Sequence, residues 1–303
     1  MPKLLILSRD EAEYRQLIES VQLTELEISK DPRECDIVLG EPKLIRDALP
    51  LLTGLKWVQS IYAGVEPLVD AAQRRNYILT NARGVFGELM SEYVFGYLLF
   101  HEKKILERIS TQQANQWQRP ESGMLRGKTI GLLGVGSIGA HLAGTAKHFG
   151  MTVRGFTRES EESTQVDQYF HGDELLKFAS GLDYFVSVLP RTNDTNQIVN
   201  GTLLNALPPH AIFINVGRGN AVDESALIQA LNERELAMAV LDVFEKEPLP
   251  EDHPFWTTPN LYMTFHTSAI SYPEDITKLF IENYQLYRED KPLEYQVDFE
   301  RGY

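Results

Sequence analysis

The fold is decided by one segment, Thr129-Ile130-Gly131-Leu132-Leu133-Gly134-Val135-Gly136-Ser137-Ile138-Gly139. An apolar run typical of a buried strand leads into glycines spaced G-x-G-x-x-G, and the residues that follow have a helical pattern. In such a unit Gly134 permits the tight turn, Gly136 lets the backbone approach a pyrophosphate, and Gly139 allows close helix–sheet packing. The helix N-terminus then faces the phosphates. The segment therefore predicts a dinucleotide-binding strand–loop–helix unit.

Short apolar runs alternate with helical patterns on both sides of this segment. Strands are expected at residues 3–7, 26–29, 36–39, 57–61, 77–81, 129–133, 152–156, 184–189, 211–216, 237–241 and 261–265. Such alternation is typical of parallel sheets covered by helices on both faces. We expect an α/β protein with two doubly wound parallel-sheet domains.

Two long helical patterns, at residues 87–110 and 273–287, would carry the chain between these domains. We therefore assign residues 1–92 and 271–303 to a first, discontinuous domain and residues 93–270 to the dinucleotide-binding domain. The cleft between two such domains is a natural place for a substrate. A polar stretch that contains Trp117 is expected to form an arm that packs on a second subunit or on its own domain.

Composition limits the class of protein. The chain has 303 residues, of which 43% are hydrophobic and 24% charged, which suits two ordinary globular domains. A net charge of −14 without a basic run argues against a nucleic-acid partner. No stretch approaches the roughly 20 apolar residues needed to span a bilayer, and the apolar start is too short for a signal peptide. A single cysteine, Cys35, excludes an internal disulfide and favours the cytoplasm.

Three polar residues each follow an apolar run that is expected to be a strand: Arg218, Glu247 and His266. In an open α/β sheet such positions collect at the carboxyl edge, where ligands bind. Arg218 can hold a carboxylate in a forked pair and polarise a carbonyl. His266 can act as a general acid or base, with Glu247 favouring the protonated ring. The alternative is a structural role, but the shared position of the three at one edge favours chemistry.

In the first domain, Ala63-Gly64-Val65 lies where an expected strand passes into a helix. Successive amides at such a turn can form a nest for a carboxylate. An ordinary strand–helix turn is the alternative.

The cofactor is indicated by Thr157-Arg158, directly after the strand that follows the glycine loop. NAD-binding units usually have Asp or Glu about 20 residues past the glycines, where it holds the ribose 2′-hydroxyl. Without that carboxylate a 2′-phosphate is not repelled, and a neighbouring guanidinium can pair with it. We expect NADP to be preferred, with NAD possible. If Arg158 is only a solvated turn residue, both cofactors would bind.

The chain resembles the D-isomer-specific 2-hydroxyacid dehydrogenases. The matching motifs occur in the family's order along nearly the whole chain: Ala63-Gly64-Val65, residues 134–139, Leu189-Pro190 with Thr192 and Thr195, residues 215–219, residues 241–250 with His253-Pro254, and His266. The resemblance implies a Rossmann cofactor domain, a flavodoxin-like discontinuous substrate domain, and a homodimer.

The resemblance also implies roles for individual residues. It assigns substrate binding and polarisation to Arg218, support of the histidine to Glu247, and proton transfer to His266, with no metal. It places a substrate carboxylate at Ala63, Gly64 and Val65. The implied cofactor contacts are Gly134, Gly136, Ser137, Ile138, Gly139, Thr157, Arg158, Leu189, Pro190, Thr195, Val216, Gly217, Asp242 and Ser268.

The Thr157-Arg158 slot and the chain length are most similar to the NADP-dependent glyoxylate/hydroxypyruvate reductase branch. We therefore expect an enzyme that transfers hydride between NADP(H) and a small 2-oxo or D-2-hydroxy acid. One departure is Phe265, where many relatives have proline before the histidine. Two alternatives stay open. One is an NAD-dependent phosphoglycerate dehydrogenase, for which Arg83 is a weak candidate phosphate ligand, and the other is a non-catalytic, dinucleotide-sensing corepressor.

Overall fold

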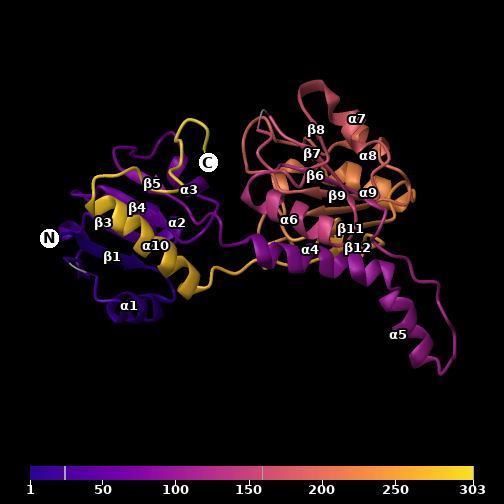
Figure 1. The fold of residues 1–303 in the computed structure, drawn as a ribbon, viewed down its shortest axis with the longest axis horizontal. Coiled ribbons are helices and arrows are strands. Elements are labelled where there is room, and N and C mark those ends of the chain that lie inside the picture. Colours follow the sequence, from indigo (N-terminus) through magenta and orange to yellow (C-terminus); the bar gives the residue numbers. More distant parts are fainter. Residues whose placement is uncertain (24, 159, 303) are drawn as a thin grey trace. The chain divides into compact units, whose positions relative to one another are not determined.

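The computed structural model describes residues 1–23, 25–158 and 160–302, and the chain forms two compact units (Figure 1). Unit 1 comprises Met1–Val85 and Ser271–Tyr303, and unit 2 comprises Phe86–Ile270. The boundary expected after residue 92 falls inside helix α4, Gly87–Glu102, whereas the units change at residue 85.

Unit 1 is built on a five-stranded sheet in the order β2-β1-β3-β4-β5, in which all neighbours are parallel. Its strands are β1 Lys3–Leu7, β2 Glu27–Ile28, β3 Ile37–Gly40, β4 Trp57–Ser60 and β5 Ile78–Thr80. This is the flavodoxin-like strand order. The chain reverses direction across the sheet between β1 and β3, which is where such folds bind ligands.

Helices cover both faces of this sheet. They are α1 Glu11–Ser20, α2 Pro42–Ala48, α3 Glu66–Val69 and α10 Pro273–Arg288, with the short 3₁₀ helix η1 Pro32–Glu34. Successive strand residues face opposite sides of a sheet. Trp57 therefore stacks on Phe280 of α10, with ring centroids 5.2 Å apart, while its neighbour Val58 packs in a cluster with Ile45 of α2 and Leu68 of α3.

Unit 2 is built on a seven-stranded parallel sheet in the order β12-β11-β10-β9-β6-β7-β8. Its strands are β6 Thr129–Leu133, β7 Thr152–Phe156, β8 Gln168–Phe170, β9 Tyr184–Ser187, β10 Ile212–Asn215, β11 Met238–Leu241 and β12 Leu261–Met263. Strands β8-β7-β6-β9-β10-β11 have the order 3-2-1-4-5-6 of the Rossmann fold, and β12 is added beside β11. Its switch point lies between β6 and β9, where a dinucleotide binds.

The sheet of unit 2 is also covered on both faces. Its helices are α4 Gly87–Glu102, α5 Ile105–Gln113, α6 Ser137–His148, α7 Leu175–Ala179, α8 Gly201–Asn205 and α9 Glu224–Asn232, with the 3₁₀ helices η2 Gly172–Glu174, η3 Gly219–Ala221 and η4 Pro254–Thr257. Leu132 packs with residues of α4 and α6, and its neighbour Leu133 packs with residues of α7, α8 and α9. The α/β class with two parallel sheets is confirmed.

Two elements differ from the expectation. Strand β8 was not predicted, because Gln168-Tyr169-Phe170 is short and only Phe170 is buried. The long helix expected over residues 87–110 is broken, because Lys104 adopts a left-handed conformation with φ 52° between α4 and α5. In the part of the chain that the structure describes, no helix is both long and apolar enough to span a membrane.

Candidate active site

The glycine loop joins β6 to α6 with the geometry that its three glycines permit. Gly134 has φ 100° and donates its N–H to the Phe156 carbonyl at 2.9 Å. A Cβ on Gly139 would lie 2.4 Å from the Gly134 oxygen, so the helix packs closer to the loop than any other residue allows. A Cβ on Gly136 would meet nothing within 4 Å, so this side of the loop is open.

The loop fits the phosphates of a dinucleotide. Within residues 1–23, 25–158 and 160–302, the backbone N–H groups of Val135, Gly136, Ser137 and Ile138 have no protein acceptor. They stand at the N-terminus of α6, whose dipole favours an anion. Gly136 and Ser137 are exposed and Val135 and Ile138 are half-buried, so this row of amides is open to a ligand.

The expected ribose slot lies at the end of β7. The Thr157 hydroxyl donates to the Ser160 carbonyl at 2.8 Å, and the Thr157 N–H donates to the Phe170 carbonyl at 3.1 Å. Arg158 is exposed beside it. No carboxylate stands at position 157, so the slot accommodates a phosphate or a hydroxyl.

His171, which was not among the expected site residues, also borders this slot. Its Nδ1 lies 3.0 Å from the Thr157 carbonyl oxygen, and its Nε2 lies 2.7 Å from Oε1 of Glu161. The hydrogen bond with Glu161, followed by the one with Thr157, raises the pKa of His171. The signal was missed because His171 follows β8, the strand that was not predicted.

The remaining expected cofactor contacts lie in the loops at the carboxyl edge. Leu189 and Pro190 follow β9, and a Cβ on Gly217 would lie 2.6 Å from the Leu189 backbone, so the loops after β9 and β10 pack tightly together. Val216 is buried beneath them. The Thr195 hydroxyl donates to the Pro190 carbonyl at 2.8 Å and closes its own loop.

Arg218, Glu247 and His266 follow β10, β11 and β12, three neighbouring strands in parallel register. The structure brings Glu247 and His266 into contact, with Oε2 of the carboxylate 2.8 Å from Nδ1 of the ring. Because a carboxylate accepts, Nδ1–H donates to it. Nε2 of His266 has no partner among the described residues, which leaves it available to an oxygen of a ligand.

The electrostatics of the three side chains are coupled. The hydrogen bond with Glu247 raises the pKa of His266, although burial and the charge of Arg218 oppose it. Burial by itself would raise the pKa of Glu247, but the hydrogen bonds from His266 and from the Phe244 N–H lower it, and the charge of Arg218 adds to this. The Glu247 carboxylate therefore favours the protonated form of the His266 ring, and the charge of Arg218 favours the ionised form of Glu247.

The turn that presents Arg218 is closed by Asn215. Nδ2–H of Asn215 donates to the Arg218 carbonyl at 3.0 Å, and its Oδ1 accepts from the Gly217 N–H at 3.2 Å. On the other side, a Cβ on Gly219 would lie 1.8 Å from the Phe244 carbonyl carbon, so only glycine fits there. The half-buried Arg218 is thus fixed between the loops after β10 and β11.

His266 has a left-handed backbone, with φ 58°, which costs a non-glycine residue about 1–2 kcal/mol. Asp242, at the end of β11 and 1% exposed, holds this loop. Its carbonyl accepts from the His266 N–H at 2.7 Å, and its carboxylate accepts from the N–H groups of Thr267 at 2.8 Å and Ser268 at 3.1 Å. Asp242 and Ser268 were expected to contact the cofactor, and both take part in this anchor.

The expected carboxylate nest lies in unit 1, after β4. Nδ2–H of Asn81 donates to the Ala63 carbonyl at 2.8 Å and fixes the turn. For the part of the chain that is described, the N–H groups of Ala63, Gly64 and Val65 have no protein acceptor. Three neighbouring amides of this kind suit an anion.

Replacing Glu247 by glutamine should lower the pKa of His266. The wild-type ring keeps its proton to a pH above 6.5, its ordinary value, because the carboxylate favours the charged form. Glu247→Gln preserves the shape but removes the charge, so the ring should lose its proton at a lower pH. Histidine-ring NMR titration measures the midpoint.

Glu224→Gln is the matched control, because it removes the carboxylate 3.2 Å from Nε2 of a different histidine, His253. It should leave the His266 midpoint where it is. An unchanged His266 midpoint in Glu247→Gln would contradict the pairing.

The sheet order, the glycine loop and the carboxyl-edge side chains define the class: a two-unit α/β protein with a Rossmann dinucleotide-binding fold. Comparisons with known proteins agree. The sequence model for the NAD-binding domain of D-isomer specific 2-hydroxyacid dehydrogenases matches residues 95–268. Glyoxylate/hydroxypyruvate reductase A of Yersinia enterocolitica is 33% identical over 258 residues, which are 82% of each chain.

Solved structures extend the likeness to both units. A D-isomer specific 2-hydroxyacid dehydrogenase family protein from Aeromonas salmonicida has a TM-score of 0.93 and 42% identity, covering 98% of this chain and 99% of its own. A D-isomer specific 2-hydroxyacid dehydrogenase from Xanthobacter autotrophicus, in complex with NADPH and MES, has a TM-score of 0.90 and 30% identity, covering 100% and 99%. This chain belongs to the D-isomer specific 2-hydroxyacid dehydrogenase family.

Proposed function

We propose that this protein is an NADPH-dependent reductase of small 2-oxo acids, of the glyoxylate/hydroxypyruvate reductase type. The observation that carries the proposal is the pair formed by His266 and Glu247, 2.8 Å apart, in the same group of loops as Arg218. The similarity to glyoxylate/hydroxypyruvate reductase A and to a dehydrogenase bound to NADPH supports the substrate class and the cofactor.

Each side chain of this site has a distinct task in the proposed reaction. A bound dinucleotide supplies hydride to the carbonyl carbon. Arg218 holds the substrate carboxylate and stabilises the negative charge that develops on the carbonyl oxygen. Nε2–H of His266 donates the proton to that oxygen, and Glu247 keeps the ring protonated until then. We assign carboxylate binding also to the amides of Ala63-Gly64-Val65.

The residues at the carboxyl edge of unit 2 would hold the cofactor. The amides of residues 135–138 suit the pyrophosphate, and Thr157 with Arg158 suits a 2′-phosphate. The charge of Glu161, which would repel a phosphate, is paired with His171 at 2.7 Å. We therefore propose NADP as the preferred cofactor, with NAD accepted.

Thr157→Asp should shift the preference from NADPH towards NADH. A carboxylate there accepts a hydrogen bond from a ribose hydroxyl but repels a phosphate, so the ratio of the two dissociation constants should change by about 10–100-fold. Fluorescence titration with each cofactor measures the ratio. Thr152→Asp, at the other end of β7, is the control and should leave it unchanged. A Thr157→Asp protein with the wild-type ratio would show that this slot does not read the 2′-position.

The proposed function is tested by following NADPH oxidation with a panel of 2-oxo acids. We expect turnover with glyoxylate and hydroxypyruvate, and slower turnover with NADH. Faster turnover of a phosphorylated hydroxypyruvate with NADH would indicate the phosphoglycerate dehydrogenase reaction instead. Cofactor binding without turnover of any 2-oxo acid would contradict an enzymatic role.

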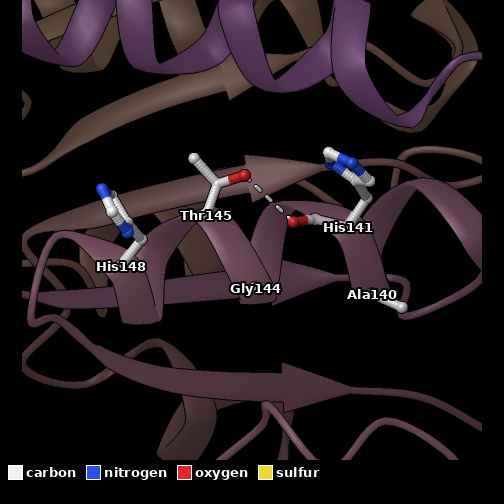
Figure 2. A pocket seen from close by; sticks show the side chains of 5 residues that line it. All are labelled: Ala140, His141, Gly144, Thr145 and His148. Atoms are coloured by element: carbon white, nitrogen blue, oxygen red, sulfur yellow. Dashed lines mark hydrogen bonds between the residues drawn. The ribbon is translucent and has the colours of Figure 1, made fainter.

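We also propose that the protein is a homodimer formed through unit 2. Helix α5 has no buried residue, and the arm after it carries Trp117, which is 90% exposed. A hollow of about 520 Å³ lies along α6, lined by Ala140, His141, Gly144, Thr145 and His148 (Figure 2). A second copy would cover such apolar surface, and sedimentation equilibrium on the whole chain decides between one and two copies.

We place the protein in the cytoplasm. Its one cysteine, Cys35, is buried and unpaired, as is usual for a thiol in a reducing compartment. Fractionation of the producing cell tests this location.

A further inference from the structure

A hydrogen-bonded chain of side chains runs behind the loop that carries His266. The Thr264 hydroxyl lies 2.5 Å from Oδ1 of Asp242, and the Tyr93 hydroxyl lies 2.7 Å from the Thr264 oxygen. Neither Tyr93 nor Thr264 was singled out from the sequence. Both lie in unit 2, in α4 and directly after β12.

The direction of the chain follows from the donors and acceptors. A carboxylate only accepts, so Thr264 donates its hydroxyl hydrogen to Asp242. The Thr264 oxygen then accepts from Tyr93, whose phenol keeps its proton because burial raises its pKa. The bonds therefore run in one sense, from Tyr93 through Thr264 to Asp242.

The carboxylate at the end of this chain is the group that anchors the His266 loop. The same Oδ1 that accepts from Thr264 also accepts from the Thr267 N–H, and Oδ2 accepts from Ser268. Two strand ends and one helix thus converge on Asp242. The helix is α4, with which the polypeptide enters unit 2, and residues 267–270 are those with which the polypeptide leaves it.

We propose that Thr264 and Tyr93 are positioning residues for His266: they fix the Asp242 carboxylate, which in turn holds the left-handed backbone of His266. Among the described residues, neither side chain hydrogen-bonds to the imidazole, so we expect their effect to pass through Asp242. The inference rests on the proposed function only where it concerns turnover. The placement of the ring itself can be measured without any substrate.

The hydroxyl of Thr264 provides the sharpest test. Thr264→Val keeps the shape but leaves Asp242 without one of its donors, whereas Thr264→Ser restores the donor. We expect Thr264→Val to lower kcat by about 10–100-fold, because a small displacement of a reacting group costs this much. Thr264→Ser should recover most of the activity. Tyr93→Phe should act in the same direction, with a smaller loss.

The readout that does not depend on turnover is the NMR signal of the His266 ring, identified by its loss in His266→Gln. Thr264→Val should shift or broaden this signal in the cofactor-free protein, and Thr264→Ser should restore it. Thr277→Val is the matched control, since Thr277 is buried and its hydroxyl finds no partner among the described residues. It should change neither the ring signal nor kcat.

Several outcomes would overturn the inference. They are a Thr264→Val protein with an unaltered His266 signal, a Thr264→Ser protein as slow as Thr264→Val, and a Thr264→Val loss of kcat matched by Thr277→Val. A Tyr93→Phe enzyme with wild-type kcat and ring signal would remove Tyr93 from the proposal. If the wild-type protein reduces no 2-oxo acid, the proposed function fails, whereas the ring signal still decides the positioning role.

Discussion

His266→Ala is expected to lower kcat for 2-oxo acid reduction by about 10²–10⁴-fold, the range typical of a positioned general acid. The loss arises because the carbonyl oxygen must then take its proton from water. The hydrogen-bond partner of the ring, Glu247, stays in place, and the glycine loop is untouched. The dissociation constant of NADPH, measured by fluorescence titration, should therefore remain near the wild-type value.

The control for this variant is His210→Ala. His210 lies in the loop before β10, at the amino edge of the same sheet, where it is exposed and 3.1 Å from Asp183. It should keep wild-type turnover. A His266→Ala enzyme that also turned over normally would eliminate His266 as the proton donor.

Arg218→Gln should lower kcat/KM by about 10²–10³-fold, as expected when a donor to a developing oxyanion is removed. Arg218→Lys should lie between this variant and the wild type, because lysine keeps the charge but lacks the planar fork. Both kcat and KM should worsen, since the guanidinium is proposed to bind the carboxylate and to stabilise the transition state. Steady-state kinetics with a 2-oxo acid measure both.

Arg191→Gln provides the comparison within the same edge of the sheet. Arg191 is half exposed and pairs with Glu245 at 3.2 Å on the surface, so its loss should have little effect. Equal kinetics for Arg218→Lys and the wild type would show that the fork is not needed. Equal losses for Arg191→Gln and Arg218→Gln would mean that general charge, not a specific contact, governs the rate.

Much of the fold could be predicted because strand and helix periods are visible locally. The apolar runs at 129–133 and 152–156 coincide with β6 and β7 in the structure. The glycine spacing identified the loop because backbone geometry admits few other residues at Gly134 and Gly139. The two elements that differed have weak local signals. Strand β8 lies at the edge of the sheet and has only three residues. The break after α4 needs a positive φ, but the residue there is Lys104 and not a glycine, so the sequence gives no sign of it.

The candidate site was predictable only in part. Glu247 and His266 each follow a strand, so their contact was a reasonable expectation. In the structure Oε2 of Glu247 lies 2.8 Å from Nδ1 of His266. The chain from Tyr93 through Thr264 to Asp242 joins residues 171 and 22 positions apart in sequence. Such contacts between distant residues leave no helical or strand periodicity in the sequence, so they can be recognised only from the packed structure. The same holds for His171.

Unit 1 is interrupted in sequence, and this has a consequence for how the protein is made. Trp57 in its sheet is covered by Phe280 and Tyr287 of α10, with ring centroids 5.2 Å and 5.5 Å apart. On the ribosome, every residue of unit 2 emerges before α10 does. Until α10 is made, the part of the N-terminal sheet around Trp57 therefore lacks its apolar cover, and translation proceeds at only about 5–20 residues per second. Unit 1 can thus complete its apolar core only after α10, the last helix to be translated, has left the ribosome.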